Sequence, residues 1–568
     1  MTKQQKWESI GTVVGSTSTD TYNFVLGSMK GSVGDIVITE SSTPTKGKVH
    51  VWGRIVSMER TNPTFPNEFA AELTRSDLDY FETIGMSGAE HLVAEVQIMG
   101  CSEASKSTEA DIELMPLNYP VKPANKVLYP DSDVLNNLLS GSKEVDKPIR
   151  VGSLINRDKV EIFFKGEALC SRHLAVLAQT GGGKTVACRT IIAGLAKYGH
   201  PMIVFDPHGD YLGLSKNIEA LKDISKNKNL NVKLVTPKLL ASPEKVGDAI
   251  SEIVRKLGMG MTEAQIGVFE NFVKDTDIFD KEETDLLKHL RKLRDKINQN
   301  RDTGDATSKR SINPILRKID IIIKKLVKME STNFKLRGMF QKKGLKFEDM
   351  ANSELEPDQF ISQNQITVLY LGGYERVVQS TMVSIILEDL FEDRSSMRTG
   401  RIPAFTAVIE EAHNFVPSKS EEKSESPSLL TIRRLLTEGR KFGTSVIMVS
   451  QRPGRLDETT LSQCNTFLVL KLVNPNDQRW VRNVMEQMSE QDSKWLKAFG
   501  KGQGYVSGNA VKFPLQVQID YEKRLEWSEL GTEKFIQDNL DEWNSGGKEA
   551  KEKAEQDSKN LAERVSKL

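Results

Sequence analysis

The spacing of apolar positions changes along this chain, and each change predicts a different kind of structure. From about residue 9 to 115, short apolar runs such as 36–39 and 91–99 are separated by turn residues. Short strands at this spacing predict a small β-barrel or sandwich over residues 1–115. The next stretch, 116–150, is rich in proline and asparagine and is expected to be a connector.

Beyond residue 150, buried-strand patterns alternate with helical patterns, which predicts an α/β fold with a mostly parallel sheet and helices on both faces. This core comes in two parts, residues 151–250 and 355–525. The predicted strands are 173–177, 202–205, 366–371, 405–409, 445–449 and 466–470, and the clearest predicted helix is 186–198.

Between the two parts of the core the strand pattern disappears. Residues 283–298 and 315–329 have helical apolar spacing, so we expect a helical insertion over 251–354. Lys and Arg outnumber Asp and Glu by 19 to 8 between Lys281 and Lys346, although the whole chain has a formal net charge of zero. The C-terminal segment, 526–568, is a charged tail, and from about Gly546 onward it is expected to be a solvated helix.

Length and composition limit the number of domains and the kinds of site that we expect. A chain of 568 residues has room for two to four domains. The four cysteines are far apart in the sequence, which argues against a disulfide framework or a zinc site and suits a reducing cytoplasm. No signal-peptide pattern opens the chain and no apolar run is long enough to span a bilayer, so we expect a cytoplasmic protein with no membrane segment.

The strongest chemical signal is the octet AQTGGGKT, between the predicted strand 173–177 and the predicted helix 186–198. A glycine-rich turn at a helix N-terminus directs backbone N–H groups and the positive end of the helix dipole at phosphates. Lys184 can reach the β- and γ-phosphates, and the Thr185 hydroxyl can ligate Mg²⁺. The usual first glycine of this motif is Ala178 here, which fits only if its φ stays negative.

Hydrolysis needs further groups, and the predicted strand 405–409 ends in two adjacent acids, Glu410 and Glu411. This is a Walker B pattern, in which Glu410 would hold Mg²⁺ through water and Glu411 would orient the attacking water. Because the first acid is usually aspartate, the longer Glu410 side chain is a departure. The competing reading is a solvated helix start.

Two polar groups complete the predicted site. Gln451 follows the predicted strand 445–449 and is placed to sense the γ-phosphate, or else to satisfy the loop backbone. Arg440 is the first candidate for an arginine finger that reaches a neighbouring subunit, since a guanidinium stabilises the charge on a transferring phosphoryl group. A surface salt bridge is an equal alternative for Arg440, and its rivals for the finger are Arg433, Arg434 and Arg452.

Together these segments resemble the HerA family of DNA-translocating ATPases, within the HerA/FtsK superfamily. The resemblance rests on the order and spacing of RHLAVLAQTGGGKT, VFDPHGDY, VIEEAHNF, EGRKFG, VSQRP and LSQCNTFLVLKL. It covers nearly the whole chain. It implies a RecA-like P-loop ATPase core, a small N-terminal barrel similar to that of ATP synthase subunits, and a helical insertion.

The resemblance also implies roles for particular residues. ATP would be contacted by Thr180, Gly181, Gly182, Gly183, Lys184 and Thr185, with Mg²⁺ at Thr185 and Glu410. Arg172 would approach the phosphates of an adjoining subunit. Asp206 and His208 would face the same cleft, although loop packing explains His208 nearly as well. Residues 502–506 resemble a closing strand that passes near the nucleotide.

The implied function is an ATP- and Mg²⁺-dependent homohexamer, or sevenfold ring, that translocates along double-stranded DNA. Its partner would be a NurA-like nuclease in DNA-end resection, or an antiphage effector such as a sirtuin-like protein or a nuclease. The rivals are a ring scaffold that activates such an effector, and a DNA pump for conjugation or packaging. Solvated helix faces explain the basic insertion better than DNA binding does; its candidate residues are Lys288, Arg291, Lys292, Arg294, Lys324, Lys325, Lys328 and Lys335.

Overall fold

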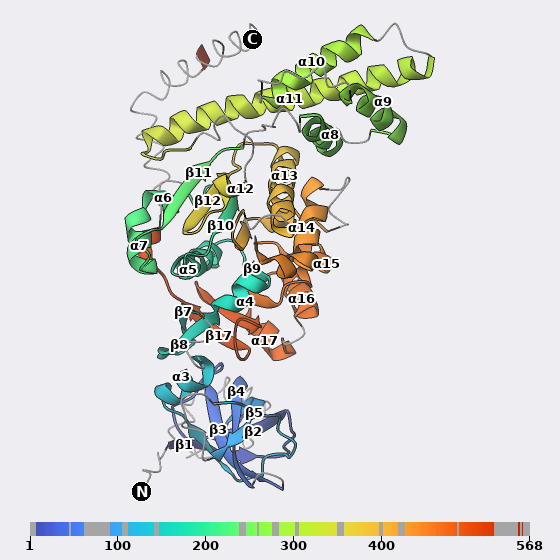
Figure 1. Cartoon of the computed structure of the whole chain (residues 1–568). Coiled ribbons are helices and arrows are strands. Elements are labelled where there is room, and N and C mark those ends of the chain that lie inside the picture. The colour runs from blue at the N-terminus through green and yellow to red at the C-terminus, as the bar shows by residue number, and fades with distance from the viewer. Residues whose placement is uncertain are drawn as a thin grey trace, which may run out of the picture. The chain divides into compact units, whose positions relative to one another are not determined.

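The computed structural model divides the chain into two compact units, each made of several separate segments of the sequence. Figure 1 labels the helices and strands that make up these units. The first comprises Met1–Gly194, Ser450–Gly454 and Leu461–Tyr521, and the second comprises Leu195–Val449, Arg455–Thr460 and Glu522–Leu568. The structure describes residues 7–44, 47–61, 91–104, 112–140, 147–237, 246–257, 261–274, 283, 285–300, 306–348, 357–396, 401–418, 426–485, 488–526, 555, 556 and 559.

The first unit opens with a closed, six-stranded antiparallel barrel of neighbour order β1-β2-β5-β4-β3-β6. Alternating residues of its strands face inward, and the large apolar side chains among them, such as Tyr22 and Phe24, form the barrel core. The strands are β1 (Glu8–Val14), β2 (Thr21–Leu26), β3 (Ile36–Thr43), β4 (Gly47–Thr61), β5 (His91–Glu103) and β6 (Lys126–Tyr129).

The rest of the first unit carries six further strands, which neighbour one another in the order β9-β15-β16-β17-β7-β8. β9 and β15 are parallel, whereas the later pairs are antiparallel. The strands are β7 (Pro148–Leu154), β8 (Arg157–Lys165), β9 (Leu174–Leu177), β15 (Thr466–Leu470), β16 (Gln503–Gly508) and β17 (Leu515–Ile519). The helices are α3 (Ser132–Ser140), α4 (Gly166–Ser171), α5 (Lys184–Ala196), α16 (Pro475–Val484) and α17 (Glu490–Trp495).

Within this unit a buried ion pair ties the barrel to the later elements. Arg54 of β4 lies 2.8 Å from the carboxylate of Asp492 in α17, and both side chains are almost fully buried. Asp492 also accepts from Ser489 in the capping box of α17. Because a buried charge is costly unless it is paired, this contact sets the orientation of α17 against β4.

The second unit contains a parallel sheet of order β11-β12-β10-β13-β14, whose central strands are buried along their whole length. Apolar residues on both faces are what a parallel sheet covered by helices requires. Its strands are β10 (Met202–Asp206), β11 (Asn231–Val235), β12 (Gln365–Tyr370), β13 (Phe405–Ile409) and β14 (Thr444–Ser450). Its helices include α6 (Gly213–Lys216), α7 (Ile218–Ser225), α12 (Pro357–Phe360), α13 (Arg376–Ser395), α14 (Pro427–Glu438) and α15 (Glu458–Leu461).

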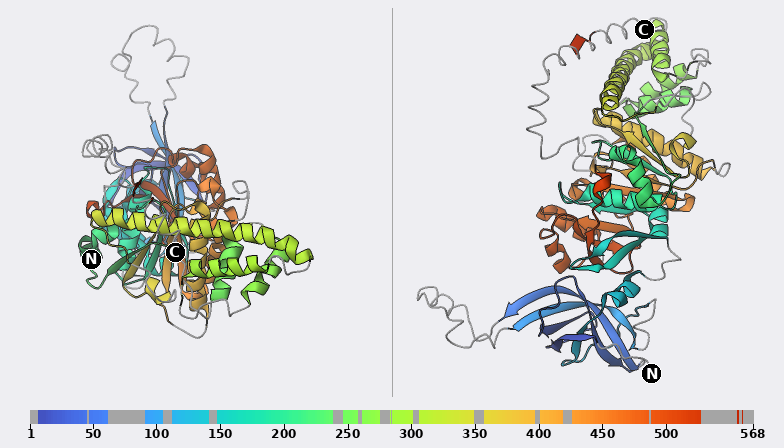
Figure 2. Two further views of the ribbon diagram at one scale, coloured as in Figure 1. Left: turned by 90° about the horizontal axis from the view of Figure 1, so that it is seen from above. Right: turned by 90° about the vertical axis from the view of Figure 1, so that its left-hand side faces the viewer.

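The described part of the chain between β11 and β12 holds helices and no strand, apart from an isolated bridge that Glu348 makes with Val235 of β11. Figure 2 shows α11 as a single long rod with α10 beside it. One apolar face of α10, including Leu290 and Leu293, is buried, as its periodicity predicts. The helices are α8 (Val246–Leu257), α9 (Glu263–Val273), α10 (Leu286–Gln299) and α11 (Ala306–Lys342).

The predicted α/β class is therefore confirmed, with its N-terminal barrel and helical insertion. The stretch expected to be a connector, 116–150, differs from that expectation because it holds β6, which closes the barrel, and α3. Most of the charged tail, 526–568, lies outside the described residues. Among the described helices, none combines the length and apolarity that crossing a membrane requires.

Candidate nucleotide-binding and carboxylate sites

The glycine-rich octet forms a tight turn between β9 and α5, as predicted. Gly181 and Gly183 have φ of 76° and 102°, conformations that side chains other than glycine rarely adopt. Lys184 is the first residue of α5 and is buried, and Thr185 follows it in the first helical turn. A helix N-terminus behind a turn of this shape is a binding site for phosphate.

Ala178, the departure from the usual motif, is accommodated without strain. Its side chain is fully buried, and its N–H donates to the Ser450 carbonyl at 3.2 Å. Of the residues that the structure describes, six that are not glycine have positive φ, and Ala178 is not among them. Ala178 therefore keeps a negative φ, as an alanine at this position of the motif requires.

A second glycine segment packs directly against the phosphate-binding turn. The Gly502 N–H donates to the Gly182 carbonyl at 3.3 Å, and Gly502 has a φ of 74°. A Cβ on Gly183 would lie 3.1 Å from both Cα and N of Gly502, closer than side chains usually approach, so a side chain at Gly183 would push against the Gly502 backbone. The loop that leads into β16 thus supports the turn from one side.

Gln451 lies beside the same turn. The Thr180 hydroxyl donates a hydrogen bond to Oε1 of Gln451, the residue that follows β14. Thr180 is exposed and Gln451 is partly exposed. The structure therefore brings together two residues predicted to contact the nucleotide, and the sensing role of Gln451 stays a prediction.

In the second unit, Asp206 ends β10 and organises the turn that follows. Its carboxylate accepts four backbone N–H bonds, from His208, Gly209, Asp210 and Tyr211, at 2.7–3.2 Å. The side chain is fully buried, and burial raises the pKa of Asp206 to about 6 despite these bonds. This explains why aspartate opens the DPHGDY segment: its carboxylate binds the turn itself. His208, by contrast, is exposed.

Glu410 follows β13 and is fully buried. The Tyr211 hydroxyl, also fully buried, donates to Oε2 of Glu410 at 2.7 Å. The Glu410 N–H donates to the Phe205 carbonyl at 3.1 Å, which extends the pairing of β13 with β10 by one residue. The carboxylate is therefore held by the turn that Asp206 organises.

Glu411 adopts a left-handed backbone conformation, with φ of 52° and ψ of 46°. This conformation is uncommon for a residue other than glycine and costs of order 1–3 kcal/mol. Nδ1 of His413 lies 3.2 Å from Oε2 of Glu411. Strained residues of this kind occur disproportionately at active sites, so the backbone adds support to the water-orienting role predicted for Glu411.

The structure separates the arginine candidates into two groups. Arg433 pairs with Asp457 at 3.0 Å, and Arg434 lies 3.5 Å from Glu438 and 5.0 Å from the Phe391 ring centroid. The other three candidate arginines are Arg172, Arg440 and Arg452. Their side chains have no hydrogen bond or ion pair with another described residue. These three remain available for a ligand or a neighbouring subunit.

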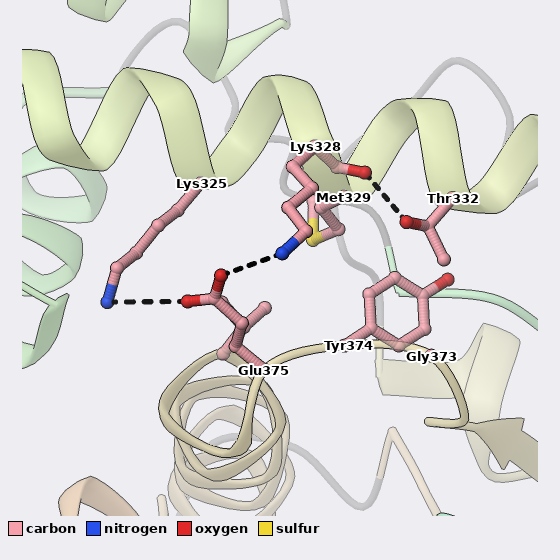
Figure 3. A pocket seen from close by; sticks show the side chains of 8 residues that line it. Lys325, Lys328, Met329, Thr332, Gly373, Tyr374 and Glu375 are labelled. Atoms are coloured by element: carbon pink, nitrogen blue, oxygen red, sulfur yellow. Dashed lines mark hydrogen bonds and ion pairs between the residues drawn. The ribbon is translucent and has the colours of Figure 1, made fainter. Parts of the chain in front are cut away.

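Several basic residues of the insertion form ion pairs within the chain. Figure 3 shows Lys325 and Lys328 of α11 on either side of the Glu375 carboxylate, at 3.9 and 3.0 Å. Lys288 lies 2.8 Å from Glu283, and Arg294 lies 3.0 Å from Asp320. Intramolecular ion pairs therefore account for half of the eight residues considered for DNA.

Sequence reasoning missed three contributors. Tyr211 lies in the recognised DPHGDY segment, but only its contact with Glu410 reveals its part in the carboxylate site. His413 was visible beside the two acids, without a role. Gly502 lies in the segment 502–506, which resembles a closing strand, but its importance depends on a backbone contact that spacing along the chain does not encode.

Comparison with known proteins agrees with these motifs. Residues 149–390 match the family model of the central domain of helicase HerA. The DNA double-strand break repair helicase HerA of Pyrococcus furiosus is 27% identical over 94% of this chain and 97% of its own length. A probable DNA double-strand break repair helicase HerA of Methanocaldococcus jannaschii is 27% identical over 77% of this chain and 86% of its own length.

Among solved structures, VirB4 of Thermoanaerobacter pseudethanolicus is similar to 66% of this chain and 97% of its own, with a TM-score of 0.44 and 13% identity. A similarity this distant does not bear on function. The match over the central domain and the relatives that span most of the chain make this chain similar to HerA helicases.

Proposed function

We propose that this protein hydrolyses ATP with Mg²⁺ and uses the energy to move DNA. The observation that carries the proposal is the phosphate-binding turn: two positive-φ glycines lead directly into buried Lys184 at the start of α5. Turns of this build hold nucleotide phosphates through backbone N–H groups and the helix dipole.

The proposal assigns a role to each group. Lys184 and residues 180–183 bind the phosphates, Gln451 senses the γ-phosphate, and Glu411 orients the attacking water. Arg440 is the first candidate to stabilise transition-state charge in a neighbouring subunit, with Arg172 and Arg452 also unengaged among the described residues.

Mg²⁺ would be held by the Thr185 hydroxyl and by Glu410. Both supply oxygen, the donor that this hard cation prefers, and Mg²⁺ usually binds through one or two carboxylates together with substrate phosphates and waters. The fixed orientation of Glu410 under the Tyr211 hydroxyl suits such a role. The bound ion would neutralise charge that develops on the phosphates.

The DNA part of the proposal is supported by the family. The relatives that cover most of this chain are described as DNA double-strand break repair helicases. By extension, we propose a ring of six subunits that translocates along double-stranded DNA and works with a nuclease or an antiphage effector.

The test compares Lys184→Ala and Glu411→Gln with the unmodified protein. Both variants should lose DNA-stimulated ATP hydrolysis, but Glu411→Gln should still bind ATP, because it keeps the phosphate-binding turn. Ring assembly, measured by light scattering, should persist in both. Full hydrolysis in both variants would exclude the assigned site. If an associated effector stays fully active with the Lys184→Ala ring, the scaffold alternative is favoured instead.

A further inference from the structure

The loop before β16 carries a lysine next to the backbone contact that supports the phosphate-binding turn. Lys501 immediately precedes Gly502, whose N–H donates to the Gly182 carbonyl at 3.3 Å. On the other side of Gly502, the Ile519 N–H donates to the Gly502 carbonyl at 2.8 Å. Bonds to two different segments hold this backbone, so the Cα of Lys501 has a set position beside the turn.

The Lys501 side chain is not used for the fold. It is exposed, and it makes no hydrogen bond or ion pair with any other residue that the structure describes. Asp520, the acid that follows Ile519, is already paired, since its Oδ2 lies 3.1 Å from the Arg150 guanidinium. The exposed lysine therefore precedes, by one residue along the chain, the glycine that contacts the phosphate-binding turn.

We propose that Lys501 binds the phosphates of the nucleotide as a second lysine beside Lys184. A lysine is a compact charge on a flexible stem, so it can follow phosphate oxygens without a fixed geometry. Hydrogen bonds between an ammonium group and phosphate are among the stronger ones in proteins. The ligand class is a nucleoside di- or triphosphate, and the inference rests on the proposed function.

The experiment measures ADP binding by calorimetry for four single variants of the full chain. Lys501→Ala should weaken binding about tenfold, the loss of one charge-assisted hydrogen bond to phosphate. Lys501→Arg keeps the charge and should bind within about threefold of the unmodified protein. Lys497→Ala is the matched control, because Lys497 is also exposed and has no ion pair with a described residue.

Lys184→Ala separates failure of this inference from failure of the proposed function. If Lys184→Ala binds ADP normally, the turn is not the nucleotide site and the proposed function falls with it. If Lys184→Ala loses binding while Lys501→Ala matches Lys497→Ala, only the role of Lys501 is overturned. An arginine variant as weak as the alanine variant would also overturn it, since charge would then not be what Lys501 supplies.

Discussion

The Tyr211 hydroxyl donates a 2.7 Å hydrogen bond to Oε2 of Glu410, and both side chains are fully buried. This bond joins the turn after β10 to the acid that ends β13. In a low-dielectric interior a hydrogen bond to a carboxylate is strong and directional. Tyr211 is therefore a positioning residue for the acid proposed to hold Mg²⁺.

Tyr211→Phe should remove this donor and leave a buried acceptor without it, at a cost of about 1–3 kcal/mol. We expect ATP hydrolysis to fall about tenfold, because 1.4 kcal/mol corresponds to a factor of ten in rate. Nucleotide affinity should change little, since the phosphate-binding turn is intact. The measurement is steady-state hydrolysis with and without DNA, at several Mg²⁺ concentrations.

Tyr119→Phe is the control for the Tyr211 variant, because Tyr119 is 46% exposed and its hydroxyl has no hydrogen bond with another residue that the structure describes. Hydrolysis by Tyr119→Phe should match that of the unmodified protein. Equal rates for the two phenylalanine variants would show that Glu410 does not depend on Tyr211.

Gly183→Ala should abolish nucleotide binding without unfolding the protein. Alanine at a φ of 102° is strained, and its Cβ would lie 3.1 Å from the Gly502 backbone. Gly267→Ala is the matched control: Gly267 lies in α9 with nothing within 4 Å of an added Cβ, so alanine should stabilise that helix by up to about 1 kcal/mol. Normal ADP binding by Gly183→Ala would contradict the close packing described above.

Arg440 can be tested by mixing subunits. Arg440→Ala and Glu411→Gln should each be inactive alone, since an arginine finger is worth about 10³–10⁵ in rate. If Arg440 acts on a neighbouring subunit, mixed rings contain some sites with both residues intact, and activity should return. Arg434→Ala should stay active, because Arg434 is engaged with Glu438 and Phe391. No recovery on mixing would rule out action in trans.

The buried carboxyl of Asp206 should make its turn pH-dependent. Burial raises the pKa of Asp206 from 3.8 to about 6, with Asp210 as a further acid nearby. The folded state thus binds this proton more tightly than the unfolded state, so the contribution of Asp206 to stability is fully present below about pH 4 and is lost as pH rises through about 6. The loss is about 3 kcal/mol at 1.36 kcal/mol per pKa unit.

Hydrogen exchange at the Gly209 and Tyr211 amides measures this effect directly. Protection, corrected for the intrinsic exchange rate, should be greater at pH 4.5 than at pH 7. Asp206→Asn removes the titrating group and should show no such change. It should also be less protected throughout, because its amide nitrogen cannot accept from the Tyr211 N–H. Constant protection in the unmodified protein would contradict the prediction.

The fold was predictable where apolar period and motif agreed. Buried strands such as β13 and β10 are short apolar runs that end in a recognisable polar group, and the helices of the insertion have a clear apolar face. The extent of the barrel was less clear, because β6 is only four residues long and follows a proline-rich stretch. A strand that short closes a barrel through pairing with distant strands, which local pattern does not reveal.

The candidate site was predictable residue by residue but not in its contacts. Motif spacing indicated Lys184, Glu410 and Gln451, because each follows or opens a regular element. It could not indicate that Asp206 binds its own turn, since the DPHGDY motif is equally compatible with a ligand contact. The status of each arginine depended on which acids lie nearby in space, so the sequence could rank Arg440 ahead of Arg433 but could not show that Arg433 pairs with Asp457.

The left-handed backbone at Glu411 has a consequence for evolution and engineering. Glycine or asparagine would relax this position, so a library screened only for thermal tolerance should enrich replacements there. The same replacements would remove the carboxylate proposed to activate water. If active variants keep glutamate at this position, then selection for ATP hydrolysis outweighs selection for thermal stability there.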